Sequence, residues 1–234
     1  MLKIIGLLVY DEHKETHQRR SKMNPLDFIY KRKSIRQFKS ESVPREDIIE
    51  LLQAATYAPS PKHQQNWHFI VLQNKEKIQE LAEIVTRSHE YFAKMAGSEK
   101  EAQKFMNLAS YYTCFKDAPV VVLVYAKPYF MIEEKMLRAN GASQEVIDEL
   151  IAPQSGAQGI GAAVENFLLG AANMGYGACY LTGPTHARLE IEKLIGFEQV
   201  DYHLMAMIAL GIPADDTPAQ PPRKPLEDVV TFID

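Results

Sequence analysis

Cysteine is almost absent from this chain: its 234 residues include only Cys114 and Cys179, far apart and without a CxxC spacing. Two isolated thiols cannot by themselves hold a zinc ion or an iron–sulfur cluster, and a disulfide framework is not expected from them. We therefore expect no metal site and, as the default compartment, the reducing cytoplasm.

An excess of positive charge is also lacking. The 26 lysines and arginines are outnumbered by 30 acidic residues, which gives a formal net charge of -4. Nucleic-acid binding domains are usually strongly basic, so we expect no nucleic-acid partner. The apolar run at residues 1–10 is shorter than the roughly 18 residues of a membrane span and leads into a charged segment, so no membrane association is expected.

The remaining composition is that of an ordinary globular protein, with 46% hydrophobic and 24% charged residues. The chain contains no repeat, low-complexity linker or shift in composition. We expect residues 1–22 to be an N-terminal extension, either an extra strand or a poorly ordered arm, and residues 23–234 to form a single α+β domain.

Hydrophobic periodicity and turn residues predict the elements of this domain. Val120 to Tyr125 is a continuous apolar run, typical of a strand covered on both faces. A Gly175-x-Gly177 pair follows a helix and enters a strand, so it does not form the dinucleotide fingerprint, which connects a strand to a helix. Helices are predicted at about 24–32, 44–58, 78–85, 88–115, 155–174 and 185–195, and strands at 67–72, 120–125, 178–181 and 204–210.

Four polar segments are candidates for binding chemistry. Three cations and a hydroxyl occur together in the segment 32–36, which suits a phosphorylated, polyhydroxylated ligand but also fits a solvated basic turn. The loop 58–67 is dense in donors and acceptors and is stiffened by prolines. The segment 175–184 leads a strand into a Gly-Pro bend, where backbone N–H groups can face a flat ligand. Arg223 lies in an extended tail that can return to a phosphate or remain solvated.

Taken in order, these segments resemble the FMN-dependent nitroreductase family. The similar stretches are RKSIRQF from Arg32, the helix that ends in APS before the strand at Trp67, ENFLLGAANMGYGACYLTG from Glu165, and the Gly-Ile-Pro turn that leads to RKPLEDVV. The resemblance covers nearly all of 25–230. It implies an α+β fold with a central mixed sheet flanked by helices, in an intertwined homodimer with two FMN sites at its interface.

Residue by residue, the resemblance implies that Arg32 and Arg223 hold the phosphate and Ser34 the ribityl chain. Arg36 approaches the pyrimidine side of the flavin ring, where its charge favours the reduced form. The full set of expected cofactor-binding residues is Arg32, Lys33, Ser34, Arg36, Ser60, Pro61, Lys62, Tyr180, Leu181, Thr182, Gly183 and Arg223. Of these, the residues from Ser60 to Lys62 are expected to reach the cofactor of the partner subunit.

The implied activity is transfer of hydride from NADH or NADPH through FMN to a small organic acceptor such as a nitroaromatic, a quinone or an enone. We expect no dedicated catalytic acid or base, because the cofactor supplies the chemistry. The aromatic-rich stretch 91–112 and the segment 127–153 are expected either to form a lid over the acceptor or to pack in the core. The alternatives are a reductive dehalogenase, a flavin-fragmenting enzyme on the same scaffold, and a flavin-binding module without turnover.

Overall fold

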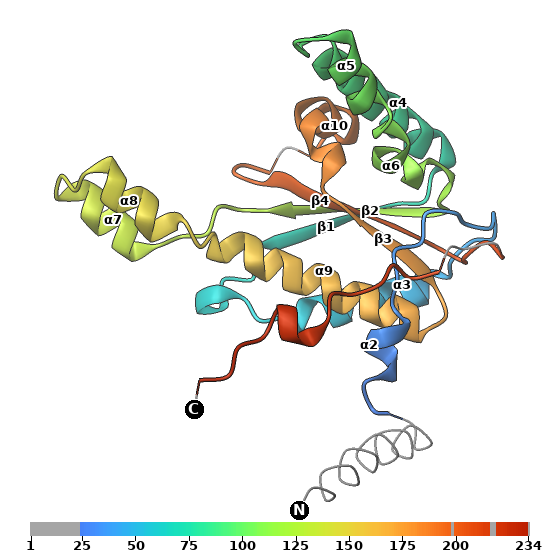
Figure 1. Ribbon diagram of the computed structural model, residues 1–234, viewed down its shortest axis with the longest axis horizontal. Helices are drawn as coiled ribbons and strands as arrows, with labels where there is room; N and C mark the ends of the chain where they lie inside the picture. Colours follow the sequence, from blue (N-terminus) through green and yellow to red (C-terminus); the bar gives the residue numbers. More distant parts are fainter. Residues whose placement is uncertain (1–23, 198, 216–218, 234) are drawn as a thin grey trace, which may run out of the picture.

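A four-stranded antiparallel sheet lies at the centre of the molecule (Figure 1). The computed structural model describes residues 24–197, 199–215 and 219–233, so the predicted N-terminal extension, 1–22, lies outside the described residues. The strand order is β1-β2-β4-β3. The strands are β1 (Trp67–Leu72), β2 (Val120–Ala126), β3 (Gly177–Leu181) and β4 (His203–Gly211).

Helices cover both faces of this sheet and extend beyond it. The α-helices are α2 (Asp27–Lys31), α3 (Arg45–Thr56), α4 (Lys75–Ala93), α5 (Glu99–Met106), α6 (Ala109–Tyr112), α7 (Ile132–Ala139), α8 (Gln144–Ile151), α9 (Ser155–Asn173) and α10 (Arg188–Ile195). The 3₁₀ turns are η2 (Pro61–His63), η3 (Cys114–Asp117), η4 (Gly183–Ala187) and η5 (Leu226–Asp228).

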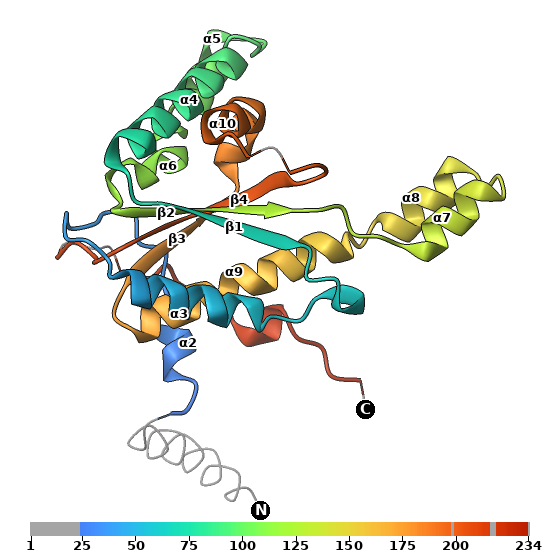
Figure 2. The same cartoon turned by 180° about the vertical axis from the view of Figure 1, so that it is seen from behind.

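The strand β2 divides the interior into two cores. All its residues are buried, as the continuous apolar run predicted. Because side chains alternate across a strand, Val122 faces the core formed with α3 and α9, whereas Leu123 faces the core formed with α4, η3 and α10. Figures 1 and 2 show these helical layers on opposite sides of the sheet. The antiparallel pair α7–α8 projects away from both layers.

Local sequence signals set several helix boundaries. The Asn74 side chain accepts a hydrogen bond from the Lys77 amide at 2.9 Å and so caps α4, and Ser143 caps α8 in the same way. Gly196 ends α10 in the left-handed conformation, with a φ of 65°. The first helix begins later than predicted: the Asn24 side chain accepts from the Leu26 amide in a turn, and α2 follows that turn.

The predicted α+β class is confirmed. All pairings between named strands are antiparallel, so the mixed character expected of the sheet rests on one parallel bridge, between Ser34 and Ala178. Whether two strands pair in parallel or antiparallel fashion depends on how the chain connects them. The residues of a single strand do not determine it. The homodimer remains a proposal.

The bridge fastens the basic segment to the edge strand β3. The Ile35 amide donates to the Ala178 carbonyl at 2.9 Å, and a Cβ added to Gly177 would lie 2.7 Å from Ile35 Cγ2. Gly177 is therefore needed for this close approach. Further along, the Ala214 amide donates to the Gln37 carbonyl at 3.0 Å. The segment from Ser34 to Gln37, which we call the strap, is thus held from both sides.

Within the described ranges, no helix combines the length and the apolar character needed to cross a membrane.

Truncating a leucine between α3 and α9 tests the packing of this layer. Leu51 is 1% exposed and packs against Gly170 of α9. A Cβ added to Gly170 would lie only 2.9 Å from Leu51 Cδ2. Leu51→Ala should lower the free energy of unfolding by about 2–5 kcal/mol, because a cavity replaces a close-packed side chain. Urea unfolding at one fixed flavin concentration measures the change.

The matched control is Leu189→Ala on α10, where the leucine is 65% exposed. Its effect should stay within about 0.5 kcal/mol. Equal effects of the two substitutions would contradict the packing described above.

Candidate functional site

A basic pocket of about 470 Å³ lies beside the strap. It contains four cationic side chains and no carboxylate among its lining residues, which are Arg32, Lys33, Ser34, Arg36, Gln37, Tyr111, Ala219, Gln220, Pro221 and Arg223. Five of the predicted cofactor residues therefore line one pocket, although they come from the two ends of the domain. Its volume falls in the range of small-molecule sites. We call it the phosphate pocket, after the role predicted for Arg32 and Arg223.

Two contacts orient the arginines of this pocket. Arg32 Nε lies 3.2 Å from Glu165 Oε1 on α9, which fixes one edge of the guanidinium group. The Arg36 guanidinium carbon lies 5.6 Å from the centre of the Tyr111 ring, a cation–π distance. Tyr111 comes from α6, so the aromatic-rich stretch contributes a wall of the pocket.

The C-terminal segment closes the other side. In the orientation of the Gln220 amide that satisfies both its ends, its oxygen accepts from Arg223 Nη2 at 2.7 Å and its nitrogen donates to the Arg32 and Tyr30 carbonyl oxygens at 3.2 Å. The amide thereby links the two arginines for which a phosphate role was predicted. Nothing in the local sequence marks Gln220, because its role depends on the return of the tail to α2.

The loop before β1 lies elsewhere. Ser60, Pro61 and Lys62 do not line the phosphate pocket. Ser60 Oγ accepts from the Gln65 amide at 3.0 Å, and Pro61 Cδ lies 3.2 Å from a Cβ placed at Gly159 on α9. The loop is therefore ordered, as its prolines predicted, but it faces a different surface from the one that carries the arginines.

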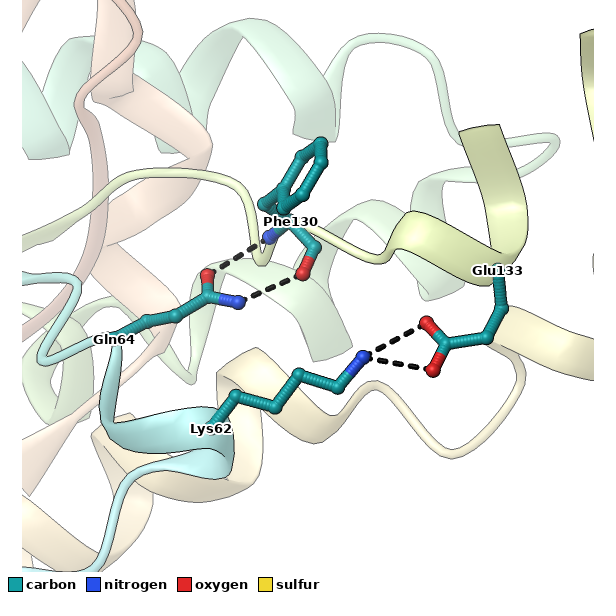
Figure 3. Close-up of polar contacts among 4 residues, drawn as sticks. All are labelled: Lys62, Gln64, Phe130 and Glu133. Atoms are coloured by element: carbon teal, nitrogen blue, oxygen red, sulfur yellow. Dashed lines mark hydrogen bonds and ion pairs between the residues drawn. The ribbon is translucent and has the colours of Figure 1, made fainter. Parts of the chain in front are cut away.

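This loop also carries the projecting pair α7–α8 (Figure 3). The Gln64 side chain both donates to the Phe130 carbonyl at 2.7 Å and accepts from the Phe130 amide at 3.0 Å, as a neighbouring strand would. Lys62 Nζ lies 2.8 Å from both carboxylate oxygens of Glu133. This hydrogen-bonded ion pair raises the pKa of Lys62 and lowers that of Glu133.

Backbone strain accompanies these contacts. Lys62, His63 and Gln65 have φ values of 51°, 53° and 44°, in the left-handed region that non-glycine residues seldom adopt. Such strain persists only where surrounding bonds hold it, and it is concentrated at functional loops. At the end of the loop, the buried Asn66 side chain donates to the Lys127 carbonyl at 2.7 Å.

The predicted residues after β3 have mixed environments. Tyr180 is 38% exposed and Thr182 is exposed, whereas Leu181 is buried in the core. Gly183 packs against the Tyr112 ring so closely that an added Cβ would lie 2.5 Å from it. None of the four lines the phosphate pocket. Gly183 nevertheless packs against α6, and Tyr111 of that helix lines the phosphate pocket.

The aromatic-rich stretch and the segment 127–153, expected either to form a lid or to pack in the core, are separate in this chain. Tyr111 lines the phosphate pocket, whereas the second segment forms α7 and α8 at the far end of α9 (Figure 1). A further pocket of about 250 Å³ lies at the base of the α7–α8 pair, and its lining includes Asn66, Tyr129 and His203.

The two cysteines, which the sequence separates, are neighbours in the structure. Cys179 is buried in β3, and Cys114 is partly buried at the start of η3. The pKa of Cys179 is lowered to about 7, first by the Cys114 thiol and then, against the effect of burial, by the charge of Arg36 and the Ser34 hydroxyl. The pair therefore lies against residues of the phosphate pocket.

Comparison with known proteins gives consistent relationships. The Nitroreductase family model matches residues 29–212. The crystal structure of a BluB-like flavoprotein from Clostridium difficile 630 is 38% identical, covers 91% of this chain and all of that chain, and superposes with a TM-score of 0.85.

Two further comparisons are less close. A protein of Methanothermobacter thermautotrophicus, provisionally named NADH dehydrogenase/NAD(P)H nitroreductase, is 29% identical over 84% of this chain and 81% of its own. The crystal structure of oxidised iodotyrosine deiodinase bound to FMN and 3-iodo-L-tyrosine is 24% identical, covers 89% of this chain and 97% of that chain, and has a TM-score of 0.64.

Proposed function

From the premise that this chain belongs to the Nitroreductase family, we propose that it is an FMN-dependent oxidoreductase that uses NADH or NADPH to reduce small organic acceptors. The observation that carries this proposal is the convergence of Arg32, Ser34, Arg36 and Arg223 on one pocket. When bound there, FMN supplies a carrier of two electrons between the nicotinamide and the acceptor, which use it in turn in a ping-pong sequence.

The pocket fits a phosphate group. A phosphomonoester carries about -1.5 to -2 charges near neutral pH, and guanidinium groups bind it through charge-assisted hydrogen bonds. Arg32 and Arg223 provide these groups, and the neighbouring Lys33 adds a third cation. The absence of lining carboxylates means that no side chain of the pocket repels the phosphate.

The other residues orient the ligand. In this proposal, which follows the family resemblance, the Ser34 hydroxyl binds the ribityl chain and Arg36 approaches the pyrimidine side of the ring. A cation near a group that gains negative charge on reduction lowers the energy of the reduced form. The resemblance also assigns Tyr180, Leu181, Thr182 and Gly183, at the end of β3, to the flavin ring. Arg36 lies over the ring of Tyr111, which lines the same pocket.

The acceptors that we propose are nitroaromatics, quinones and enones. A second candidate is reductive dehalogenation of a halogenated tyrosine, which is supported by a relative from Thermotoga neapolitana named iodotyrosine deiodinase, 26% identical over 88% of this chain and 97% of its own length. A third is a flavin-fragmenting enzyme. A flavin-binding module without turnover is the alternative from outside the enzymes.

Steady-state oxidation of NADH and of NADPH tests the main proposal. With a nitroaromatic or a quinone as acceptor, we expect acceptor-dependent turnover of about 1 s⁻¹ or faster, the ordinary range for enzymes. Release of iodide from iodotyrosine in place of this activity would support the dehalogenase. Loss of the flavin spectrum in the presence of oxygen would indicate fragmentation. A protein that binds flavin but turns over none of these substrates would be a binding module.

Removing either predicted phosphate ligand should weaken FMN binding. Arg32→Ala and Arg223→Ala should each cost about 2–3 kcal/mol, the worth of a buried hydrogen bond to a charged group. That loss corresponds to a roughly 30- to 150-fold higher dissociation constant, which flavin fluorescence titration measures.

Two controls make this result specific for the phosphate. Riboflavin, which lacks the phosphate, should bind wild type and both variants with similar affinity. Arg87→Ala removes an arginine that pairs with Glu83 and Glu190, outside the pocket, and should leave FMN affinity unchanged. Unchanged FMN affinity in both Arg32→Ala and Arg223→Ala would place the phosphate elsewhere.

We also propose that the protein is a homodimer in which Ser60, Pro61 and Lys62 complete the cofactor site of the partner. Three observations support this assembly. These residues do not line the phosphate pocket of their own chain. The C-terminal segment exposes apolar side chains, including Phe232 at 83% and Ile233 at 94%. The half-exposed face of α9 carries small residues, such as Gly161 and Ala162, that permit close packing.

Sedimentation equilibrium should give twice the 26.5 kDa chain mass at micromolar concentration. Ile233→Asp should raise the dimer dissociation constant at least ~10-fold, because an unpaired charge is costly to bury. Leu189→Asp, on an exposed position of α10 on the other side of the sheet, should not. A stable, flavin-loaded monomer would refute the assembly.

A further inference from the structure

The pocket at the base of the α7–α8 pair, which we call the α9 pocket, has an apolar part and a polar part. Met131 before α7, Leu150 and Ile151 of α8, and Met205 of β4 contribute apolar side chains to its lining. Its volume of about 250 Å³ is roughly eight times the share of one water molecule in the liquid, which suits a small organic ligand. The α9 pocket and the phosphate pocket have no lining residue in common.

The first turn of α9 forms the polar part of this pocket. Residues 154–157, from the residue before the helix through its first three, all line it. Among the described residues no side chain caps this helix, and the amides of Ala157 and Gln158 donate to the Gln154 carbonyl. The amides of Ser155 and Gly156, which have no intrahelical partner, are therefore available to a ligand. Because the N-terminus of a helix is the positive end of its dipole, these amides favour an anionic group.

A buried amide side chain lies against this turn. Asn66, the residue before β1, is 7% exposed and lines the α9 pocket. Its Nδ2 donates to the Lys127 carbonyl at 2.7 Å and would lie 3.5 Å from a Cβ added to Gly156. The Oδ1 at the other end of the amide is buried and has no hydrogen-bond partner in the part of the chain that the structure describes. Because a buried acceptor without a partner is costly, a ligand that donates a hydrogen bond to Oδ1 is favoured.

The charged side chains of the lining also favour a carboxylate. Lys127 contributes a cation, and Glu134 is the one acidic residue among the described residues that line the pocket. Arg138 neutralises this carboxylate, because its Nη2 and Nε lie 2.8 Å and 2.9 Å from Glu134 Oε1. An anionic ligand in the α9 pocket therefore meets the N-terminus of a helix and a lysine, and the only lining carboxylate is already paired.

We propose that the α9 pocket binds a small apolar α-hydroxy or α-amino acid. The carboxylate accepts hydrogen bonds from the amides of Ser155 and Gly156, and the hydroxyl or ammonium group next to it donates to Asn66 Oδ1. The two polar groups of such an acid are adjacent, as are Asn66 and Gly156. The apolar side chain of the acid lies against Leu150 and Met205. This site does not depend on the proposed reductase activity.

A ligand in this pocket contacts the projecting α7–α8 pair and the body of the molecule together. Leu150 and Ile151 belong to α8, whereas Asn66 and the start of α9 belong to the body (Figure 1). Binding should therefore slow amide hydrogen exchange in α8, because the ligand stabilises the form in which the pair is held against the body.

Calorimetric titration of the purified protein, with its flavin retained, tests the proposal. Phenyllactate and phenylalanine carry the hydroxyl and the ammonium donor, and the preferred one of the two should bind with a Kd of about 1 mM or lower. Hydrocinnamate, which lacks the donor, should bind about 3- to 10-fold more weakly than the preferred acid. Phenyllactamide, which lacks the negative charge, should bind at least ~10-fold more weakly than phenyllactate. These comparisons require no variant and no activity.

Three variants then locate the bound acid. Asn66→Ala should bind the preferred acid and hydrocinnamate equally well, because the acceptor for the donor group is gone. Ala157→Phe places a ring in the pocket and should abolish binding. The matched control is Ala152→Phe, at an exposed position after α8 that does not line the pocket, and it should bind as the wild type does.

Failure of both phenyllactate and phenylalanine to bind the wild type at millimolar concentration would overturn the proposal. So would equal binding of hydrocinnamate and the preferred acid by the wild type. Unchanged binding in Ala157→Phe would place the acid at another site, such as the flavin, and would also overturn it.

Discussion

The attachment of the strap to the edge strand β3 is the contact on which the site depends. One backbone hydrogen bond, from the Ile35 amide to the Ala178 carbonyl, sets the register of the strap. The Ile35 side chain then occupies the space that Gly177 leaves, and any larger residue there would displace it. With Ile35 buried on the strand, Ser34 and Arg36 on either side of it are directed toward the pocket. The four cationic side chains of the pocket are positioned by this contact between Ile35 and Gly177 and by the return of the C-terminal segment that carries Arg223.

The predicted cofactor residues lie on two surfaces of one chain. The arginines gather at the strap, while the strained loop from Ser60 to Gln65 faces the projecting pair α7–α8. Within the chain, Gln64 and Lys62 connect that loop to the arm and not to the pocket. In the proposed dimer, a second copy would bring its loop to the strap and so combine the two surfaces. The α7–α8 pair of each chain would then be connected, through its loop, to the cofactor site of the other chain.

Much of the fold could be predicted from the sequence, because the signals are local. The strand Trp67–Leu72 has the bounds that its apolar pattern predicted, and the buried run at Val120 lies at the centre of the sheet. That Arg32 and the distant Arg223 share one pocket was expected only through resemblance, since a basic turn alone does not reveal a pocket. The contact of Tyr111 with Arg36 and the role of Gln220 were not predicted, because each residue meets the segment 32–37 from a distant part of the chain. The cysteine pair escaped for the same reason.

The visible absorption spectrum of the purified protein, with identification of the ligand that denaturation releases, tests the central claim most directly. A pocket with cations for one terminal phosphate, in a chain without a dinucleotide fingerprint, predicts a yellow protein that releases FMN. Release of FAD, or a colourless protein that does not bind added FMN, would contradict the account.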